Sequence, residues 1–183
     1  MAKSIRIRSG QSARRVEPGA WRFLRTFILS WLALTLLPLV IPPIPPFSRA
    51  LTAWSLGLCL RALGIPALVD GEVVTFPPAG AFRIITDCTA LYIAPIFAGA
   101  VLAAPVDWRQ KAVALGWGIP LVLLFNLLRL IGLALIMIHW PAAFDFFHEY
   151  LWQVLFGATV IVIWWVWCER ALRRRAVAQP QAG

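Results

Sequence analysis

The chain has 183 residues, of which 61% are hydrophobic and 14% charged, and its mean hydropathy is +0.78. A soluble domain is closer to half apolar and a quarter charged. The composition therefore excludes a cytosolic globular enzyme, a disordered protein and a secreted domain held by disulfides. The length allows roughly four to six membrane-spanning helices of about 20 residues each.

The net charge is +9, and the basic residues cluster beside the apolar runs. They precede the first run, follow the last one, and recur in the short break at 105–111. Because short loops rich in Lys and Arg stay in the cytoplasm, we expect both termini and this break to be cytoplasmic. The acidic gaps then face outward. No separate basic domain is present, so we expect no nucleic-acid partner.

The first apolar run, 23–41, is interpreted as an uncleaved signal anchor that ends at a proline-rich stretch, 42–46. The next run, 47–63, is shorter and carries an arginine near each end. A third crossing there would place a basic segment on the wrong side. We therefore expect 47–63 to be an amphipathic helix lying on the outer leaflet.

Turn residues punctuate 65–87, and the two segments between them, 72–76 and 81–85, predict a small outward-facing β-hairpin. Apolar runs at 89–105, 112–138 and 150–168 follow, with kinks expected at Pro95 and Pro120. The expected fold class is thus all-α and integral to the membrane. It consists of a bundle of about four transmembrane helices, one interfacial helix and the hairpin.

Three parts of the chain are expected on this basis. A basic cytoplasmic arm, 1–22, precedes a single membrane domain, 23–168, that carries the catalytic groups. A basic, flexible cytoplasmic tail, 169–183, follows it.

Three polar residues are unusual for a purely structural bundle. Cys88 and His148 open two of the apolar runs and are expected at outward-facing helix N-termini, where a thiol ionises more readily. Arg129 lies inside the run 112–138, about 27 Å along the helix axis from Lys111, near the outer edge of a hydrocarbon core about 30 Å thick. All three are therefore predicted at one membrane level. A buried arginine usually has a partner, although at this depth Arg129 could also snorkel to the headgroups.

Several neighbours could support these three groups. Asn126 lies one turn before Arg129 on the same helical face and could orient it, or could equally form an interhelical hydrogen bond. Asp87 favours the neutral thiol of Cys88, and Thr89 supplies a hydroxyl beside it. Cys59 and Cys168 are interpreted as packing residues. A metal site built from four titratable residues is conceivable but shows no recognised ligand spacing: His139, Asp145, His148 and Glu149. We expect no metal and no cofactor.

A thiol, a guanidinium and an imidazole at one level predict nucleophilic acyl transfer. Cys88 would attack a peptide carbonyl, and His148 would move the proton. Arg129 would hold the oxyanion or position the substrate. Such a substrate must reach the outer leaflet, so it is expected to be membrane-anchored.

Residues 51–166 resemble the exosortase/archaeosortase family of multi-spanning cysteine transpeptidases. The resemblance includes Leu63-Gly64-Ile65-Pro66, the hairpin with Asp70-Gly71, Asp87-Cys88, Asn126-x-x-Arg129 and His148. It implies that Cys88 is the nucleophile, Arg129 its basic partner and His148 the third member. It also implies substrates with a C-terminal sorting signal (a short motif, a transmembrane helix and a basic cluster), and a glycan or lipid acceptor at the surface of the inner membrane.

The sequence departs from the family pattern at one point, because Thr89-Ala90 follows the cysteine where Ser-Gly is typical. Two other functions therefore stay open. One is a catalytically inactive, exosortase-like scaffold or assembly factor. The other is a protein that handles lipid or polyprenyl phosphate through Arg129.

Overall fold

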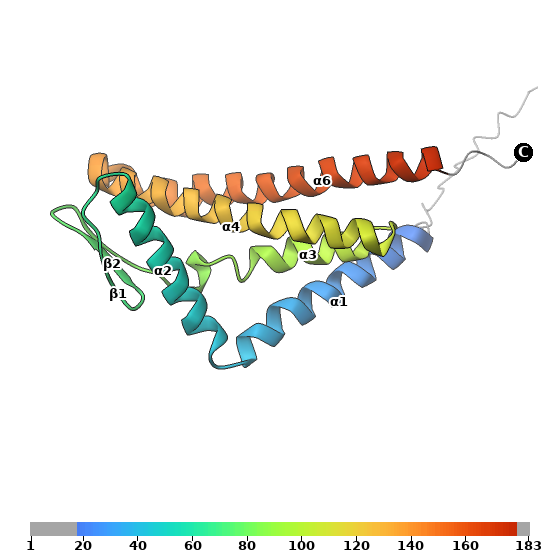
Figure 1. The fold of residues 1–183 in the computed structure, drawn as a ribbon, viewed down its shortest axis with the longest axis horizontal. Coiled ribbons are helices and arrows are strands. Elements are labelled where there is room, and N and C mark those ends of the chain that lie inside the picture. The colour runs from blue at the N-terminus through green and yellow to red at the C-terminus, as the bar shows by residue number, and fades with distance from the viewer. Residues whose placement is uncertain (1–17, 179–183) are drawn as a thin grey trace, which may run out of the picture.

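The computed structural model describes residues 18–178, which form a mostly helical molecule with one small sheet (Figure 1). The N-terminal residues 1–17 and the last five, 179–183, lie outside the described part of the chain, and with them most of the predicted arm. Three described helices are long and apolar enough to cross a membrane: Gly19–Val40, Trp108–His139 and Pro141–Arg174.

The N-terminal half contains two helices that meet at an angle (Figure 1). Helix α1, Pro18–Val40, ends at the proline-rich stretch, and α2, Ile44–Ala62, begins within it. One face of α2 is buried against the sheet and α4, while four large apolar side chains remain exposed on it: Phe47, Leu51, Trp54 and Leu58. A helix over 47–63 is confirmed, and its place in the outer leaflet stays a prediction.

The predicted hairpin is one part of a three-stranded antiparallel sheet. Strand β2, Val73–Phe76, pairs with β3, Gly80–Arg83, as expected, and it also pairs with β1, Leu68–Asp70. The expectation of two strands was therefore wrong by one strand. The turn before β2 contains Gly71 at φ +56°, a left-handed conformation that glycine adopts without steric cost.

The expected span at 89–105 is shorter in the structure, because helix α3 covers only Ile93–Ala103. Eleven residues rise about 16 Å, which is too little for a helical span of a core about 30 Å thick. Pro95 lies in the first turn of α3, where proline is tolerated, and therefore introduces no kink inside the helix. Residues 18–178 thus contain three candidate spans, and the expected count of about four transmembrane helices stays a prediction.

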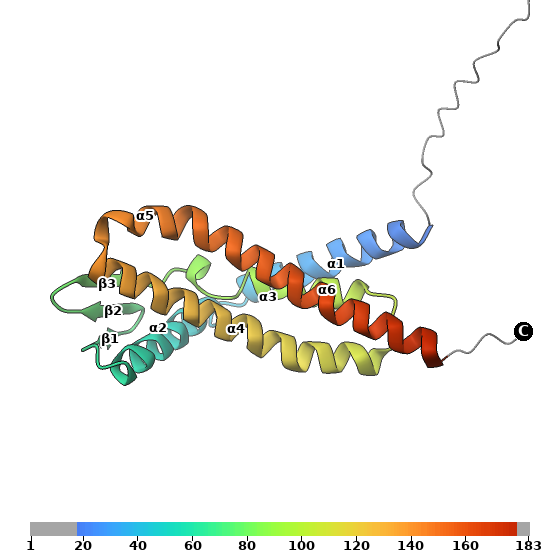
Figure 2. The same cartoon turned by 90° about the horizontal axis from the view of Figure 1, so that it is seen from above.

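The long helices α4, Trp108–His139, and α6, Trp152–Ala178, run antiparallel along the molecule (Figures 1 and 2). They are joined by a 3₁₀ turn at Pro141–Ala143, the short helix α5, Phe144–Phe146, and a π-helical turn at Phe147–Leu151. We expected the last span to end at 168 and a flexible tail from 169. That expectation was wrong for residues 169–178, which continue α6, where Arg173 pairs with Glu169 one turn earlier.

Two groups of buried side chains form the core. One gathers α2, the sheet and the second half of α4, and includes Leu56, Phe76 and Cys88. The other lies between α3, α4 and α6, and includes Ala90 and Phe97. The segment around Cys88 therefore joins the two groups, at the end of the molecule that carries the sheet.

Candidate active site

Cys88 lies in a 3₁₀ turn, Thr86–Cys88, between β3 and α3. Its backbone N–H donates to the Ile85 carbonyl at 2.9 Å, and the Thr89 hydroxyl donates to the Thr86 carbonyl at 2.6 Å. These bonds close the turn before α3 begins at Ile93. The expectation that Cys88 opens a helix was therefore wrong, and its thiol does not lie at an α-helix N-terminus.

The turn also accommodates Ala90 without strain. No non-glycine residue among those described has a positive φ, and the Ala90 side chain is buried in the core between α3, α4 and α6. The position that is typically glycine in the family pattern thus needs no glycine in this chain.

Asn126 connects the Cys88 turn to Arg129. Its amide nitrogen Nδ2 donates to the Cys88 carbonyl oxygen at 2.9 Å, and its Oδ1 accepts a hydrogen bond from Arg129 Nη1 at 3.4 Å. Both side chains are buried, with exposures of 3% for Asn126 and 7% for Arg129. Asn126 therefore donates its hydrogen bond to the 3₁₀ turn that carries Cys88, and not to another transmembrane helix.

Arg129 points into the protein rather than toward the headgroups. Its guanidinium carbon lies 5.9 Å from the centroid of the Phe156 ring of α6, within the range of a cation–π interaction. Its Nε is buried without a hydrogen-bond partner among the described residues. The buried position of the Arg129 guanidinium therefore does not fit an arginine that snorkels to the headgroups.

His148 is held by aromatic packing at the start of the last span. Its ring stacks on Phe144, with centroids 5.5 Å apart and an interplanar angle of 12°. Phe144 in turn packs against Phe82 of β3 at 5.6 Å. His148 itself lies in the π-helical turn Phe147–Leu151, a rare local geometry that is frequent at functional sites.

Cys88 and His148 line one cavity of about 100 Å³. The other walls come from β3 and the residue after it, α4 and α5: Phe82, Arg83, Ile84, Leu130, Leu133 and Phe144. Arg129 does not line this cavity. It is connected to the Cys88 backbone by the two hydrogen bonds of Asn126. Between the described residues, no hydrogen bond joins the Cys88 sulfur to the His148 ring. The structure thus gathers the three predicted groups at one end of the bundle.

The remaining predicted residues differ in position. Thr89 is buried and its hydroxyl closes the Cys88 turn, whereas Asp87 is exposed. Cys59 and Cys168 are half-buried free thiols and do not line the Cys88 cavity. Within residues 18–178, no group of three or more potential ligand side chains comes together, so the metal set considered from the sequence does not converge.

Arg83 is the one charged residue of the cavity that sequence reasoning missed. It ends β3, five residues before Cys88, and lines the cavity while its side chain remains exposed. The available signal was a cation within the predicted strand 81–85, which lies shortly before the thiol.

Comparison with protein families extends these observations. The transmembrane exosortase family model matches residues 16–165. Comparison with curated proteins gave no match, and comparison with solved structures gave none either. The matched range contains Cys88, Arg129 and His148, together with every element that builds the cavity. This chain is therefore a multi-helix membrane protein of the transmembrane exosortase family.

Proposed function

We propose that this protein is a membrane-embedded cysteine peptidase or transpeptidase that cleaves C-terminal sorting signals. The observation that carries the proposal is the cavity shared by the Cys88 thiol and the His148 imidazole. A nucleophile and a base must face the same space in order to act on one peptide bond.

The chemistry proceeds in two halves. His148 takes the proton of the Cys88 thiol as the sulfur bonds to the carbonyl carbon of the scissile peptide. The tetrahedral intermediate collapses with loss of the C–N bond, and His148 returns the proton to the leaving amine. In the second half, an acceptor amine, hydroxyl or water attacks the thioester. The C–S bond then breaks, and the proton taken from the acceptor goes back to the sulfur.

Arg129 supports this chemistry without contacting the cavity. It does not line the cavity, so its role shifts from holding the oxyanion to positioning Cys88 through Asn126. Its positive charge also offsets negative charge that develops on the sulfur, because a cation close to a thiolate stabilises it. Arg83, at the cavity wall, is the better placed cation for contacting substrate.

The substrate class follows from the family and the position of the site. Exosortase membership supports a membrane-anchored protein with a short motif, one transmembrane helix and a basic cluster. The sheet and α5, which contribute walls of the cavity, lie at the end of the bundle opposite to the start of α1 and the end of α6 (Figure 1). With the basic flanks cytoplasmic, that end faces outward from the inner membrane, where a glycan or lipid acceptor is accessible.

The test is coexpression with a tagged substrate and variants of each cysteine. Cys88→Ala is expected to leave only full-length precursor, whereas Cys59→Ala and Cys168→Ala are expected to process it normally. His148→Gln is expected to block processing while the protein stays in the membrane at wild-type level. Mature product from Cys88→Ala would refute the mechanism.

A non-catalytic scaffold is the second candidate. Two observations favour it: the Cys88-Thr89-Ala90 departure from the family pattern, and the lack of a described hydrogen bond between thiol and imidazole. The scaffold predicts that a membrane-impermeant thiol reagent labels Cys88 no faster than an exposed model thiol at neutral pH. Faster labelling that His148→Gln abolishes supports the peptidase instead.

A further inference from the structure

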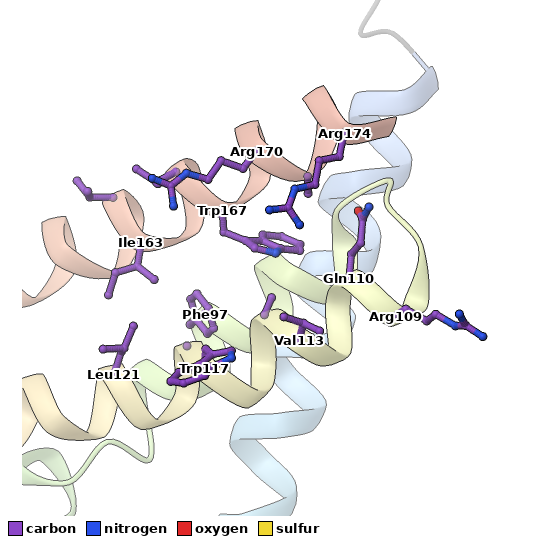
Figure 3. Close-up of a pocket in the computed structure, with 15 residues that line it drawn as sticks. Phe97, Arg109, Gln110, Val113, Trp117, Leu121, Ile163, Trp167, Arg170 and Arg174 are labelled. Atoms are coloured by element: carbon purple, nitrogen blue, oxygen red, sulfur yellow. The ribbon is translucent and has the colours of Figure 1, made fainter. Parts of the chain in front are cut away.

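A second cavity lies near the start of α4 and the end of α6 (Figure 3), and Cys88 does not line it. Its volume is about 630 Å³, within the range of about 300–1,000 Å³ typical of small-molecule sites. It lies between the first half of α4 and the last half of α6, with Phe97 of α3 at its base. The proposed peptidase activity makes no use of it.

Most of its lining is apolar. Trp117 of α4 and Trp167 of α6 contribute indole rings, and aliphatic side chains continue the slot toward the middle of the bundle: Val113, Leu121, Val162 and Ile163. The slot is exposed to its surroundings along α4, where Trp117 is 74% exposed. In a bilayer this opening faces lipid chains, so the slot suits a hydrocarbon chain that enters from the side.

Cations cluster at the terminal end of the slot. Arg109, Arg170 and Arg174 all line it, and no described acidic side chain pairs with any of them. Arg173, on the same helix, does not line the cavity and is paired with Glu169. The arginines that line the cavity thus have no acidic partner among the described residues, whereas Arg173, outside the cavity, has one. Figure 3 shows Arg174 extending toward Trp167 and Gln110, while Arg109 extends away from the bundle.

Gln110 adds a polar group without a partner. Its Oε1 is buried and accepts no hydrogen bond from any described residue, and its side chain lines the same cavity. Leaving a buried acceptor unpaired costs free energy. A ligand hydroxyl or ammonium group at this position would satisfy it.

We propose that this cavity binds an anionic phospholipid of the leaflet on the side of the termini. One acyl chain lies in the slot, and the phosphate lies against Arg170 and Arg174. Basic pockets between transmembrane helices on the cytoplasmic side are suited to anionic headgroups. A peptide segment followed by a basic cluster fits less well, because the uncompensated charges of Arg170 and Arg174 repel it.

The test measures phospholipid binding to the full chain in detergent by native mass spectrometry. The probes are phosphatidylglycerol and phosphatidylcholine with identical acyl chains. We expect phosphatidylglycerol to bind at least tenfold more tightly, and the double variant Arg170→Gln/Arg174→Gln to lose that preference. Arg173→Gln is the matched control, since it removes the same charge from the same helix, and it should bind as the wild type does.

A second variant tests the slot apart from the charge. Val113 is 61% exposed, so Val113→Trp fills the opening with little disturbance of the core. It should weaken phosphatidylglycerol binding at unchanged net charge. Equal binding of the two lipids, full binding by the double arginine variant, or no effect of Val113→Trp would each overturn the proposal.

Discussion

The hydrogen bonds of Asn126 provide the sharpest test of the site geometry. Asn126→Ala removes the donor to the Cys88 carbonyl and the acceptor for Arg129 Nη1, and Arg129 Nε already lacks a partner. Leaving a buried polar group unpaired costs about 1–3 kcal/mol. Hydrogen bonds between transmembrane helices contribute about 0.6 kcal/mol on average to stability, because the polar groups of the unfolded chain in the membrane also find partners.

We expect the two losses of Asn126→Ala to total about 1–3 kcal/mol in the free energy of unfolding. The substitution leaves two groups without a hydrogen bond, the Cys88 carbonyl and the charged Arg129 Nη1. Reversible unfolding in mixed micelles measures this difference. Thr159→Ala is the control, because that hydroxyl is exposed and bonds only to its own helix at Leu155.

A loss for Asn126→Ala within about 0.5 kcal/mol of the Thr159→Ala value would refute the geometry, since surface substitutions fall in that range. Substrate processing should fall in parallel, at matched amounts of folded protein, because the same bond fixes the backbone that carries the thiol.

Three further predictions concern other contacts. Gly132→Ala would place a Cβ 2.8 Å from the Trp152 ring and should destabilise the protein by about 1–3 kcal/mol, measured by thermal unfolding. Its control is Gly116→Ala, whose Cβ meets nothing within 4 Å and which should be neutral or slightly stabilising. Arg49→Ala breaks a 2.7 Å ion pair to Glu72, in the turn between β1 and β2, and a hydrogen bond to Thr86 of the Cys88 turn. We expect about 1 kcal/mol of lost stability and slower processing; normal processing would show that the turn needs no such support. Arg83→Ala should reduce processing about tenfold, equivalent to about 1.4 kcal/mol, with an unchanged unfolding midpoint, and a shifted midpoint would assign Arg83 a structural role instead.

Hydropathy and turn residues predicted most of the fold because they act locally. Strand β1 was missed because three residues, Leu68–Asp70, carry no periodicity of their own and become a strand only by pairing with β2. Helix α3 starts late because residues 89–92 form a bend and a turn, in which the Leu91 backbone N–H donates to the Thr89 hydroxyl at 3.3 Å. Helix α6 continues past its apolar stretch because residues after 168 form helix with polar side chains and an ion pair.

The candidate site was predictable only in part. Cys88, Arg129 and His148 could be placed at one level from helix rise and charge asymmetry. The bond from Asn126 to the Cys88 carbonyl spans 38 positions, and no local pattern encodes it. Arg83 is recognisable in the sequence as a cation within a predicted strand, but its place at the cavity depends on how the sheet packs against α4 and α5.

The length of α4 sets a further geometric condition. Its 32 residues extend about 48 Å, and Arg129 lies about 31 Å from Trp108, close to the full thickness of the hydrocarbon layer of about 30 Å. Under the proposed function, a substrate anchored in the same bilayer would present to Cys88 the residues that emerge just above its own transmembrane helix. We therefore expect processing to fall when a rigid spacer is inserted between that helix and the scissile bond.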